Sequence, residues 1–145
     1  GDADDSYNFL ELSLFIERLQ AGYDMVMGNR FAGGITKGAM PWLHRYVGNP
    51  FLSSLGRFLF KNNIGDFHCG LRAFTKKCYN IINPQCNGME FASELVALAS
   101  IHQMRICEIP VTLYPDGRKR RPHLRSWRDG FRHMVLLYSL YLLRN

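Results

Sequence analysis

Several signals that define other protein classes are missing from this 145-residue chain. Its four cysteines (Cys69, Cys78, Cys86 and Cys107) form no C-x-x-C pair and no evident disulfide framework, which favours free thiols in a reducing compartment. The sequence contains no internal repeat. The terminal apolar run at 134–143 is much shorter than a membrane-spanning helix, which needs about 20 residues. The chain opens on an acidic cluster without a signal peptide, and we expect it to be a fragment whose earlier half is absent.

Residues 1–104 have no net charge, because nine Lys/Arg balance nine Asp/Glu. Residues 105–145 carry nine basic residues and three acidic ones. The whole net charge of +6 therefore lies in the second segment. This asymmetry predicts an anionic partner, which would be phosphate groups, nucleic acid or a membrane surface. The composition, with 47% hydrophobic and 21% charged residues, is that of a globular domain.

Helical and strand-like segments alternate along the chain, and this alternation predicts an α/β layer fold. The helices are indicated by apolar residues spaced three and four apart and by end signals such as Ser6, Gly22 and Pro41. The strands are short apolar runs, and Pro110 favours an edge position or a bend for the last one. The expected helices cover 8–20, 41–61, 89–103 and 126 to the end, and the expected strands cover 24–30, 71–75 and 105–114.

Two carboxylates open the chain in the sequence Asp2-Ala3-Asp4, and Asp5 adds a third. Side chains at positions i and i+2 of a strand end share one side, so Asp2 and Asp4 can reach one hard cation. A Mg²⁺ or Mn²⁺ ion held in this way completes its shell with substrate phosphates and water, and it neutralises charge on a diphosphate leaving group. An acidic cluster before a helix can also serve only as a cap or as a partner of the helix dipole.

Basic residues suited to phosphate follow at two points. Arg30 ends the strand predicted at 24–30 and precedes a glycine-rich loop. His44 and Arg45 lie in the first turn of the helix that begins at Pro41, where free backbone N–H groups and the positive end of the helix dipole favour anions. The alternative interpretation of each is a solvated surface residue.

The turn at 66–72 combines a carboxylate, an imidazole and a thiol. His68 and Cys69 are adjacent, so their side chains point apart, and no second ligand pair follows, which argues against zinc. Asp66 is the candidate catalytic residue, either as a base or as a group that braces the turn and positions substrate. Glu90 and Glu94 share one helix face, and a solvated face is the default expectation for them.

The most basic segment lies at 118–133. It lacks the interleaved aromatic residues and the module patterns of nucleic-acid-binding domains. Arg125, Arg128 and Arg132 instead form one helical stripe beside the apolar run at 134–143, which is typical of an interfacial helix. We therefore favour a membrane surface as the partner of this segment. An anionic substrate is a compatible alternative, and nucleic acid is not expected.

The order of these motifs carries more information than each motif alone. It closely resembles glycosyltransferase family 2, and in particular the branch of polyprenyl-phosphate sugar synthases such as dolichol-phosphate mannose synthase and its bacterial relatives. The resemblance covers essentially the whole chain, and the Asp-x-Asp and Asp-x-x-Cys-Gly motifs are its most specific parts. The segments that carry it are 2–6, 27–31, 33–34, 41–45, 66–72, 88–94 and 125–133.

The resemblance implies a GT-A fold, which is a Rossmann-like layered α/β/α domain, here incomplete because its nucleotide-binding half would precede this chain. It also implies an inverting reaction with a nucleotide-sugar donor and a divalent metal, Mg²⁺ or Mn²⁺. By this resemblance Asp2, Asp4 and Arg30 bind the donor diphosphate, and Asp2 and Asp4 are the metal ligands. Asp66 matches a segment at the floor of the active site.

The resemblance also implies acceptor contacts, with two departures from the family pattern. The synthases often carry a Gln where this chain has Ser6, and the Gln-x-x-Arg-Trp motif of processive polysaccharide synthases is absent, which argues against a polymerase. The residues expected to bind acceptor or other phosphates are His44, Arg45, Arg118, Arg120 and Arg121.

The sequence thus predicts transfer of a sugar to a polyprenyl phosphate, or another glycan acceptor, at the cytosolic membrane face for cell-envelope or glycan biosynthesis. An acceptor phosphate is largely ionised at pH 7 and needs little help from a base, whereas a sugar hydroxyl would need one, and Asp66 would supply it. We expect residues 1–124 to be the C-terminal portion of the catalytic domain and residues 125–145 to be a basic amphipathic juxtamembrane helix. The protein would be peripheral, or integral if transmembrane helices follow residue 145. The alternative is a non-catalytic basic module for membranes or nucleic acid, and the fragment alone is expected to be inactive.

Overall fold

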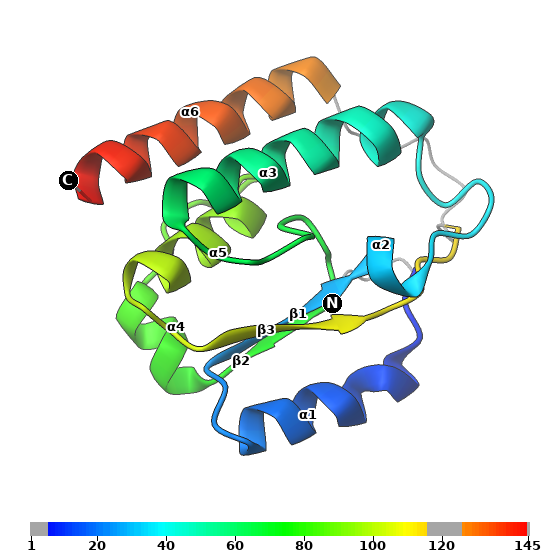
Figure 1. Cartoon of the computed structure of the whole chain (residues 1–145), viewed down its shortest axis with the longest axis horizontal. Coiled ribbons are helices and arrows are strands. Elements are labelled where there is room, and N and C mark those ends of the chain that lie inside the picture. Colours follow the sequence, from blue (N-terminus) through cyan, green and yellow to red (C-terminus); the bar gives the residue numbers. More distant parts are fainter. Residues whose placement is uncertain (1–5, 116–125, 145) are drawn as a thin grey trace.

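The computed structural model describes residues 6–115 and 126–144, which form three layers (Figure 1). A three-stranded sheet lies in the middle, α1 covers one face, and α5 and α3 lie on the other side with α6 packed outside them. The predicted α/β layer fold is therefore confirmed. The strands are β1 (Met25–Asn29), β2 (Arg72–Phe74) and β3 (Ile106–Pro110), and the helices are the 3-10 turn η1 (Phe9–Glu11), α1 (Leu12–Gln20), α2 (Arg30–Gly33), the π-helical turn η2 (His44–Gly48), α3 (Asn49–Phe60), α4 (Lys76–Ile82), α5 (Phe91–Ile101) and α6 (Ser126–Arg144).

Strand β1 is the centre of the sheet. It runs antiparallel to β2 and parallel to β3, with Met25 opposite Ile106 and Asn29 opposite Pro110. The side chain of Met25 packs into the cluster formed with α4 and α5, whereas that of Val26 packs with α1 on the other face. Burial on both faces explains why β1 is a continuous apolar run. Pro110 ends β3 at the edge of the described sheet, as its inability to donate to a ladder predicts.

The helix predicted from Pro41 onwards forms, but a π-helical turn at 44–48 interrupts it after its first residues. Within η2 the N–H of Asn49 donates to the carbonyl of His44. Pro50 has no N–H to donate, and a wider turn just before it is compatible with that missing bond. The sequence prediction missed α4, a seven-residue helix that Thr75 caps by accepting a hydrogen bond from the N–H of Cys78 at 3.0 Å.

Gly33 is required where α2 passes close to β3. A Cβ atom at Gly33 would overlap the backbone of Val111, so we expect Gly33→Ala to destabilise the protein by about 1–3 kcal/mol through overpacking. Gly130→Ala in α6 is the matched control, because its Cβ would meet nothing within 4 Å. The control should stabilise the helix by about 0.5–1 kcal/mol. Urea denaturation of both variants measures the difference, and equal effects would contradict the close approach.

Candidate functional site

The candidate site lies where β1 leaves the sheet at Asn29 and Arg30. The parallel strands β1 and β3 both end here, and ligands of α/β sheets commonly bind outside the carboxyl ends of such strands. The turn at 64–70, which precedes β2, lies against this end, because the N–H of Gly28 donates to the carbonyl of Leu71 at 2.9 Å. The sheet therefore brings two segments together that are far apart in the sequence.

Arg30 and Asp66 form a buried bidentate ion pair at this point. The Nε of Arg30 donates to Oδ2 of Asp66 and its Nη2 donates to Oδ1, both at 2.7 Å, and the backbone N–H of Arg30 donates to Oδ2 at 3.1 Å. Asp66 is 0% exposed and Arg30 is 8% exposed. Burial alone would lower the pKa of Arg30, but the hydrogen bonds and the charge of Asp66 outweigh it and raise this pKa. Both carboxylate oxygens of Asp66 are thus used to hold Arg30.

The turn that carries Asp66 is fixed from two sides. Oε1 of Glu108 in β3 accepts hydrogen bonds from the N–H groups of Gly65 and Asp66, both at 2.9 Å. Oγ of Ser53 in α3 accepts one from the N–H of Phe67 at 3.2 Å. Because buried backbone N–H groups are costly to leave unpaired, these bonds define one conformation of the turn. Asp66 is consequently held in place before any ligand binds.

Tyr7 ties the start of the described chain to the same turn. Its hydroxyl oxygen accepts a hydrogen bond from the N–H of Gly70 at 3.0 Å and lies 3.8 Å from Sγ of Cys69. Burial raises the pKa of Tyr7 and raises that of Cys69 to about 11, so both are neutral at pH 7 and Cys69 is not a thiolate nucleophile. The sequence interpretation missed Tyr7, whose only signal is an aromatic ring with a polar tip just after the acidic cluster.

A groove of about 420 Å³ lies beside the ion pair, between α2 and α3. It offers mixed chemistry, with the amide of Asn29, the guanidinium of Arg57 and the apolar ring of Phe31 among its lining groups. Arg57 is oriented by a hydrogen bond from its Nη2 to Oγ of Ser54 at 2.9 Å. The full lining comprises Asn29, Phe31, Ala32, Pro50, Ser54, Arg57 and Gly65.

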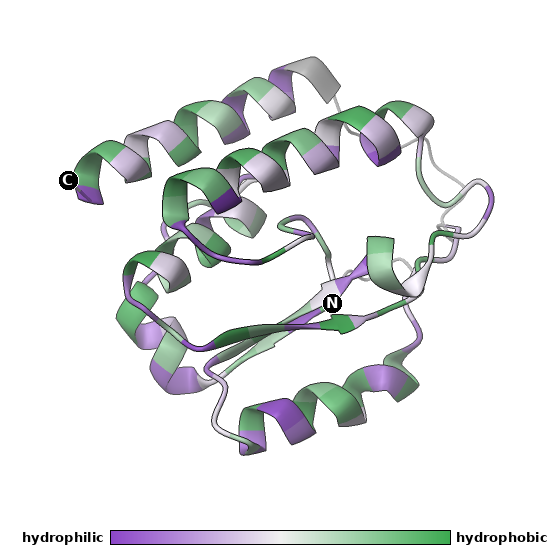
Figure 2. Ribbon diagram, in the orientation of Figure 1, coloured by the Kyte–Doolittle hydropathy of each residue, from purple (hydrophilic) through white to green (hydrophobic). Residues whose placement is uncertain are grey.

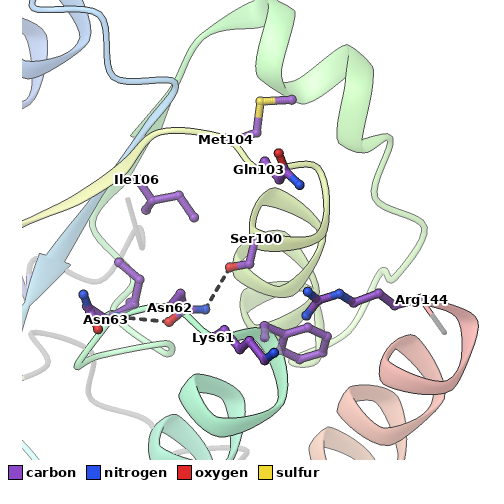
Figure 3. A pocket seen from close by; sticks show the side chains of 10 residues that line it. Lys61, Asn62, Asn63, Ser100, Gln103, Met104, Ile106 and Arg144 are labelled. Atoms are coloured by element: carbon purple, nitrogen blue, oxygen red, sulfur yellow. Dashed lines mark hydrogen bonds between the residues drawn. The ribbon is translucent and has the colours of Figure 1, made fainter.

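A second pocket of about 390 Å³ lies at the opposite end of the sheet (Figure 3). Met104 and Ile106, at the amino end of β3, lie on one side of it, and Arg144 of α6 lies on another. Asn62 crosses it by donating from Nδ2 to Oγ of Ser100 at 2.8 Å. Because it lies at the amino ends of the parallel strands, this pocket is not part of the site around Arg30.

The predicted site residues fall into three groups. Arg30 and Asp66 are brought together, and His44 and Arg45 lie in η2, where Nη1 of Arg45 donates to the carbonyl of Ile35 at 3.4 Å. Within residues 6–115 and 126–144 no group of three or more His, Cys, Asp and Glu side chains could hold a metal. The predicted residues that lie outside the described part of the chain are Asp2, Asp4, Arg118, Arg120 and Arg121.

The expectation of a solvated face for Glu90 and Glu94 is wrong, because both side chains are buried. The segment before α5 folds back over its first turn, and the carboxylate of Glu94 accepts from the N–H groups of Gln85 at 3.0 Å and Cys86 at 2.8 Å. Glu90 pairs with Arg132 of α6. Tertiary contacts, which helical spacing does not reveal, therefore decide the environment of this face.

The chain is similar to several known proteins, although no protein-family model matches it. The chain is 38% identical to the low-salt glycan biosynthesis hexosyltransferase Agl6 of Haloferax volcanii, over 92% of this chain and 32% of that protein. It is 33% identical to the dolichyl-phosphate hexose transferase of the same organism, over 76% of this chain and 46% of that protein. It is 30% identical to the polyprenol monophosphomannose synthase of Mycolicibacterium smegmatis, over 77% of this chain and 43% of that protein. The chain thus spans less than half the length of each of these relatives.

Proposed function

From the premise that this chain belongs to the glycosyltransferase family of these relatives, we propose that it is part of an enzyme that transfers a sugar from a nucleotide sugar to a polyprenyl phosphate. The observation that carries the proposal is the buried ion pair, in which Asp66 holds Arg30 at the carboxyl end of β1. A guanidinium fixed in this way is suited to phosphate, because its planar donors match phosphate oxygens. Polyprenol and dolichyl phosphate in the names of two relatives support the same class of acceptor.

A phosphate acceptor agrees with the chemistry available to Asp66. A phosphate monoester has a second pKa of about 6, so it is already a nucleophile at pH 7 and needs little help from a base. The oxygens of Asp66 are both occupied by Arg30, so taking up a proton would break the ion pair. Of its two predicted roles, the geometry favours positioning over action as a base. The enzyme's main tasks are then to hold two phosphates close together, with inversion at the sugar, and to neutralise their charge.

We further propose that Asp2 and Asp4 hold a divalent cation, Mg²⁺ or Mn²⁺, which would supply neutralising charge to the donor diphosphate. Chain geometry supports this proposal. Asp4 is three residues before Tyr7, so their Cα atoms are at most about 11 Å apart, and Tyr7 contacts the turn of Asp66 through Gly70. This limit on chain length is compatible with a role for Asp4 near the segment that orients Arg30.

A contact with the cytosolic membrane surface is proposed from the outer face of α6. Phe131, Val135, Tyr138 and Leu142 are all exposed, and their spacing of four, three and four residues places them along one side of the helix. Arg128 is exposed on the same helix, as expected for an interfacial helix near anionic lipids. Apolar segments alternate with polar ones along α6 in Figure 2. None of the helices in the described part of the chain is long and apolar enough to cross a membrane.

Membrane binding should weaken when the apolar side of α6 is made polar. We expect the double substitution Phe131→Ser and Tyr138→Ser to lower binding to vesicles with one third anionic lipid at least about tenfold, because a lost 1.4 kcal/mol of burial is a factor of ten. The matched control replaces Leu14 and Ile16, two exposed residues of α1, by Ser. Flotation of the full-length protein measures both, and equal loss in the control would contradict a role specific to α6.

The proposed transfer is tested with membranes that express the full-length gene. They are incubated with radiolabelled nucleotide sugars, with and without added polyprenyl phosphate, and then extracted into organic solvent. The proposal predicts label in the organic phase that depends on the added lipid phosphate. Label confined to soluble products would overturn it. Salt-sensitive binding to oligonucleotides, with no transfer from any nucleotide sugar, would instead favour the non-catalytic basic module.

A further inference from the structure

A buried serine links two histidines across three segments of the fold. Oγ of Ser93 in α5 lies 2.9 Å from Nε2 of His68 in the turn and 2.7 Å from Nδ1 of His133 in α6. The two rings lie edge to face, with centroids 4.9 Å apart. Ser93 is 0% exposed and His133 is 5% exposed. These contacts are separate from the ion pair of Arg30, and none of the three side chains has a role in the proposed transfer.

The proton count of this cluster selects one arrangement. A hydroxyl group has a single hydrogen to donate, so at most one imidazole accepts from Ser93 and at least one donates to it. Nδ1 of His68 is buried without a hydrogen-bond partner, and a proton there would be an unpaired buried donor that costs about 1–3 kcal/mol. His68 therefore carries its proton on Nε2 and donates to Ser93, which donates to Nδ1 of His133.

Charge supports a neutral cluster. Burial lowers the pKa of His68 to about 3, with His133, Arg30 and Arg72 acting in the same direction and Asp66 opposing them. Burial also lowers the pKa of His133, with Arg132 acting in the same direction and Glu90 and Asp129 opposing it. Both imidazoles are thus uncharged at pH 7. The hydrogen bonds described above require this, because Nδ1 of each ring carries no proton.

Catalysis by Ser93 itself is not compatible with this geometry. A serine nucleophile must reach its substrate, whereas Ser93 is 0% exposed and is enclosed by a ring on each side. A metal site is also not indicated, because the described residues contain no group of three or more His, Cys, Asp and Glu side chains that could hold one. The remaining role is to fix the relative position of the segments that the three residues connect.

We propose that His68, Ser93 and His133 form a positioning relay between α6 and the turn that carries Asp66. The backbone N–H of His68 donates to Oδ1 of Asp66 at 3.3 Å, and Asp66 holds Arg30. The relay therefore determines how Arg30 is placed relative to α6. This inference rests on the proposed function, in which Arg30 binds phosphate and the outer side of α6 contacts the membrane.

α6 is attached to the body of the domain at more than one point, which makes the relay a defined connection. Leu137 is 0% exposed and packs in a cluster with Leu59, Phe60 and Ala97. One turn before Leu137, His133 makes the relay contact. A helix held by both packing and hydrogen bonds transmits its position to the turn more rigidly than packing alone would.

The test compares Ser93→Ala with Ser100→Ala in the full-length protein. Both remove one serine hydroxyl from α5, but Ser100 bonds to Asn62 and the carbonyl of Val96 at the distant pocket. We expect Ser93→Ala to raise KM for the nucleotide sugar about tenfold with a much smaller change in kcat, because it loosens the placement of a binding group. His133→Asn keeps a polar atom near the position of Nδ1 and should restore part of the affinity relative to His133→Leu. Equal KM values for the Ser93 and Ser100 variants would overturn the relay.

A second readout does not depend on transfer. ¹⁵N NMR of the histidine rings in the full-length protein should show His68 and His133 as neutral Nε2–H tautomers at pH 7, with His68 uncharged down to pH 5. An imidazolium at pH 7, or a proton on Nδ1 of His68, would overturn the relay. If the wild-type protein transfers no sugar to polyprenyl phosphate, the proposed function fails, while the ring spectra still decide the relay.

Discussion

Asp66→Asn will destabilise the protein by about 3–5 kcal/mol, because it leaves the charge of Arg30 uncompensated in a buried site. The amide offers one acceptor oxygen where the carboxylate now accepts four hydrogen bonds, three from Arg30 and one from the backbone N–H of His68. Denaturation by urea measures the loss. The matched control is Asp24→Asn, because Oδ2 of Asp24 accepts from the N–H of Arg105 at an exposed position, and its cost should stay near 1 kcal/mol. Equal costs would contradict a buried pair.

Removing both charges separates stability from chemistry. The double variant Arg30→Met with Asp66→Asn should recover most of the stability that Asp66→Asn loses, because no buried charge is left unpaired and the amide oxygen can still accept from a backbone N–H. It should nevertheless have no measurable transfer activity, since the guanidinium is gone. If the double variant is folded and still transfers sugar, Arg30 does not bind a reacting phosphate.

The double substitution Asp2→Asn and Asp4→Asn will lower the transfer rate about a thousandfold. A metal ion commonly contributes several kcal/mol of charge stabilisation, and about 4 kcal/mol corresponds to that factor. Asp5→Asn is the control in the same segment, because Asp5 lies outside the Asp2-Ala3-Asp4 motif, and its effect should be below about threefold. The measurement is the transfer rate across a Mn²⁺ titration. Equal losses in the control would contradict the assignment of Asp2 and Asp4 as the metal ligands.

Local patterns in the sequence predicted most of the elements of the fold. The apolar run at 24–30 became the central strand, and the periodic segments at 8–20 and 89–103 became α1 and α5, because burial of one face or of both is visible in residue order. Helix α4 was missed because it is short and is defined by the cap of Thr75. The π-helical turn η2 was missed because it depends on which carbonyl each backbone N–H bonds to, and residue composition does not show this.

The sequence indicated two residues of the candidate site, Arg30 and Asp66, but not the contact between them. Arg30 and Asp66 were both candidates, yet their ion pair joins positions 36 residues apart, and the pairing of β1 with β2 and the contacts of the turn with Glu108 and Ser53 place them together. Tyr7 and Ser93 carry no distinctive signal, because a buried hydroxyl is recognised by its surroundings. The burial of Glu90 likewise depends on α6, which lies elsewhere in the sequence.

Helix α6 connects the proposed membrane contact with the candidate site around Arg30. Its inner side holds His133 and Leu137, both buried, and its outer side presents exposed residues such as Phe131 and Tyr138. A helix of this kind can rest on a membrane while its other side remains part of the domain. Contact with the lipid surface would then place Arg30 at a defined depth from the acceptor.

The most direct test of the central claim compares two acceptors that differ only in the phosphate. The full-length enzyme is given one nucleotide sugar with either a polyprenyl phosphate or the corresponding polyprenol, and the initial rates of transfer are measured. An enzyme whose nucleophile is an ionised phosphate, and whose Asp66 positions Arg30 rather than acting as a base, will form product only with the polyprenyl phosphate. Comparable rates with the alcohol would contradict this account, because a hydroxyl acceptor requires a base that Asp66, paired with Arg30, does not provide.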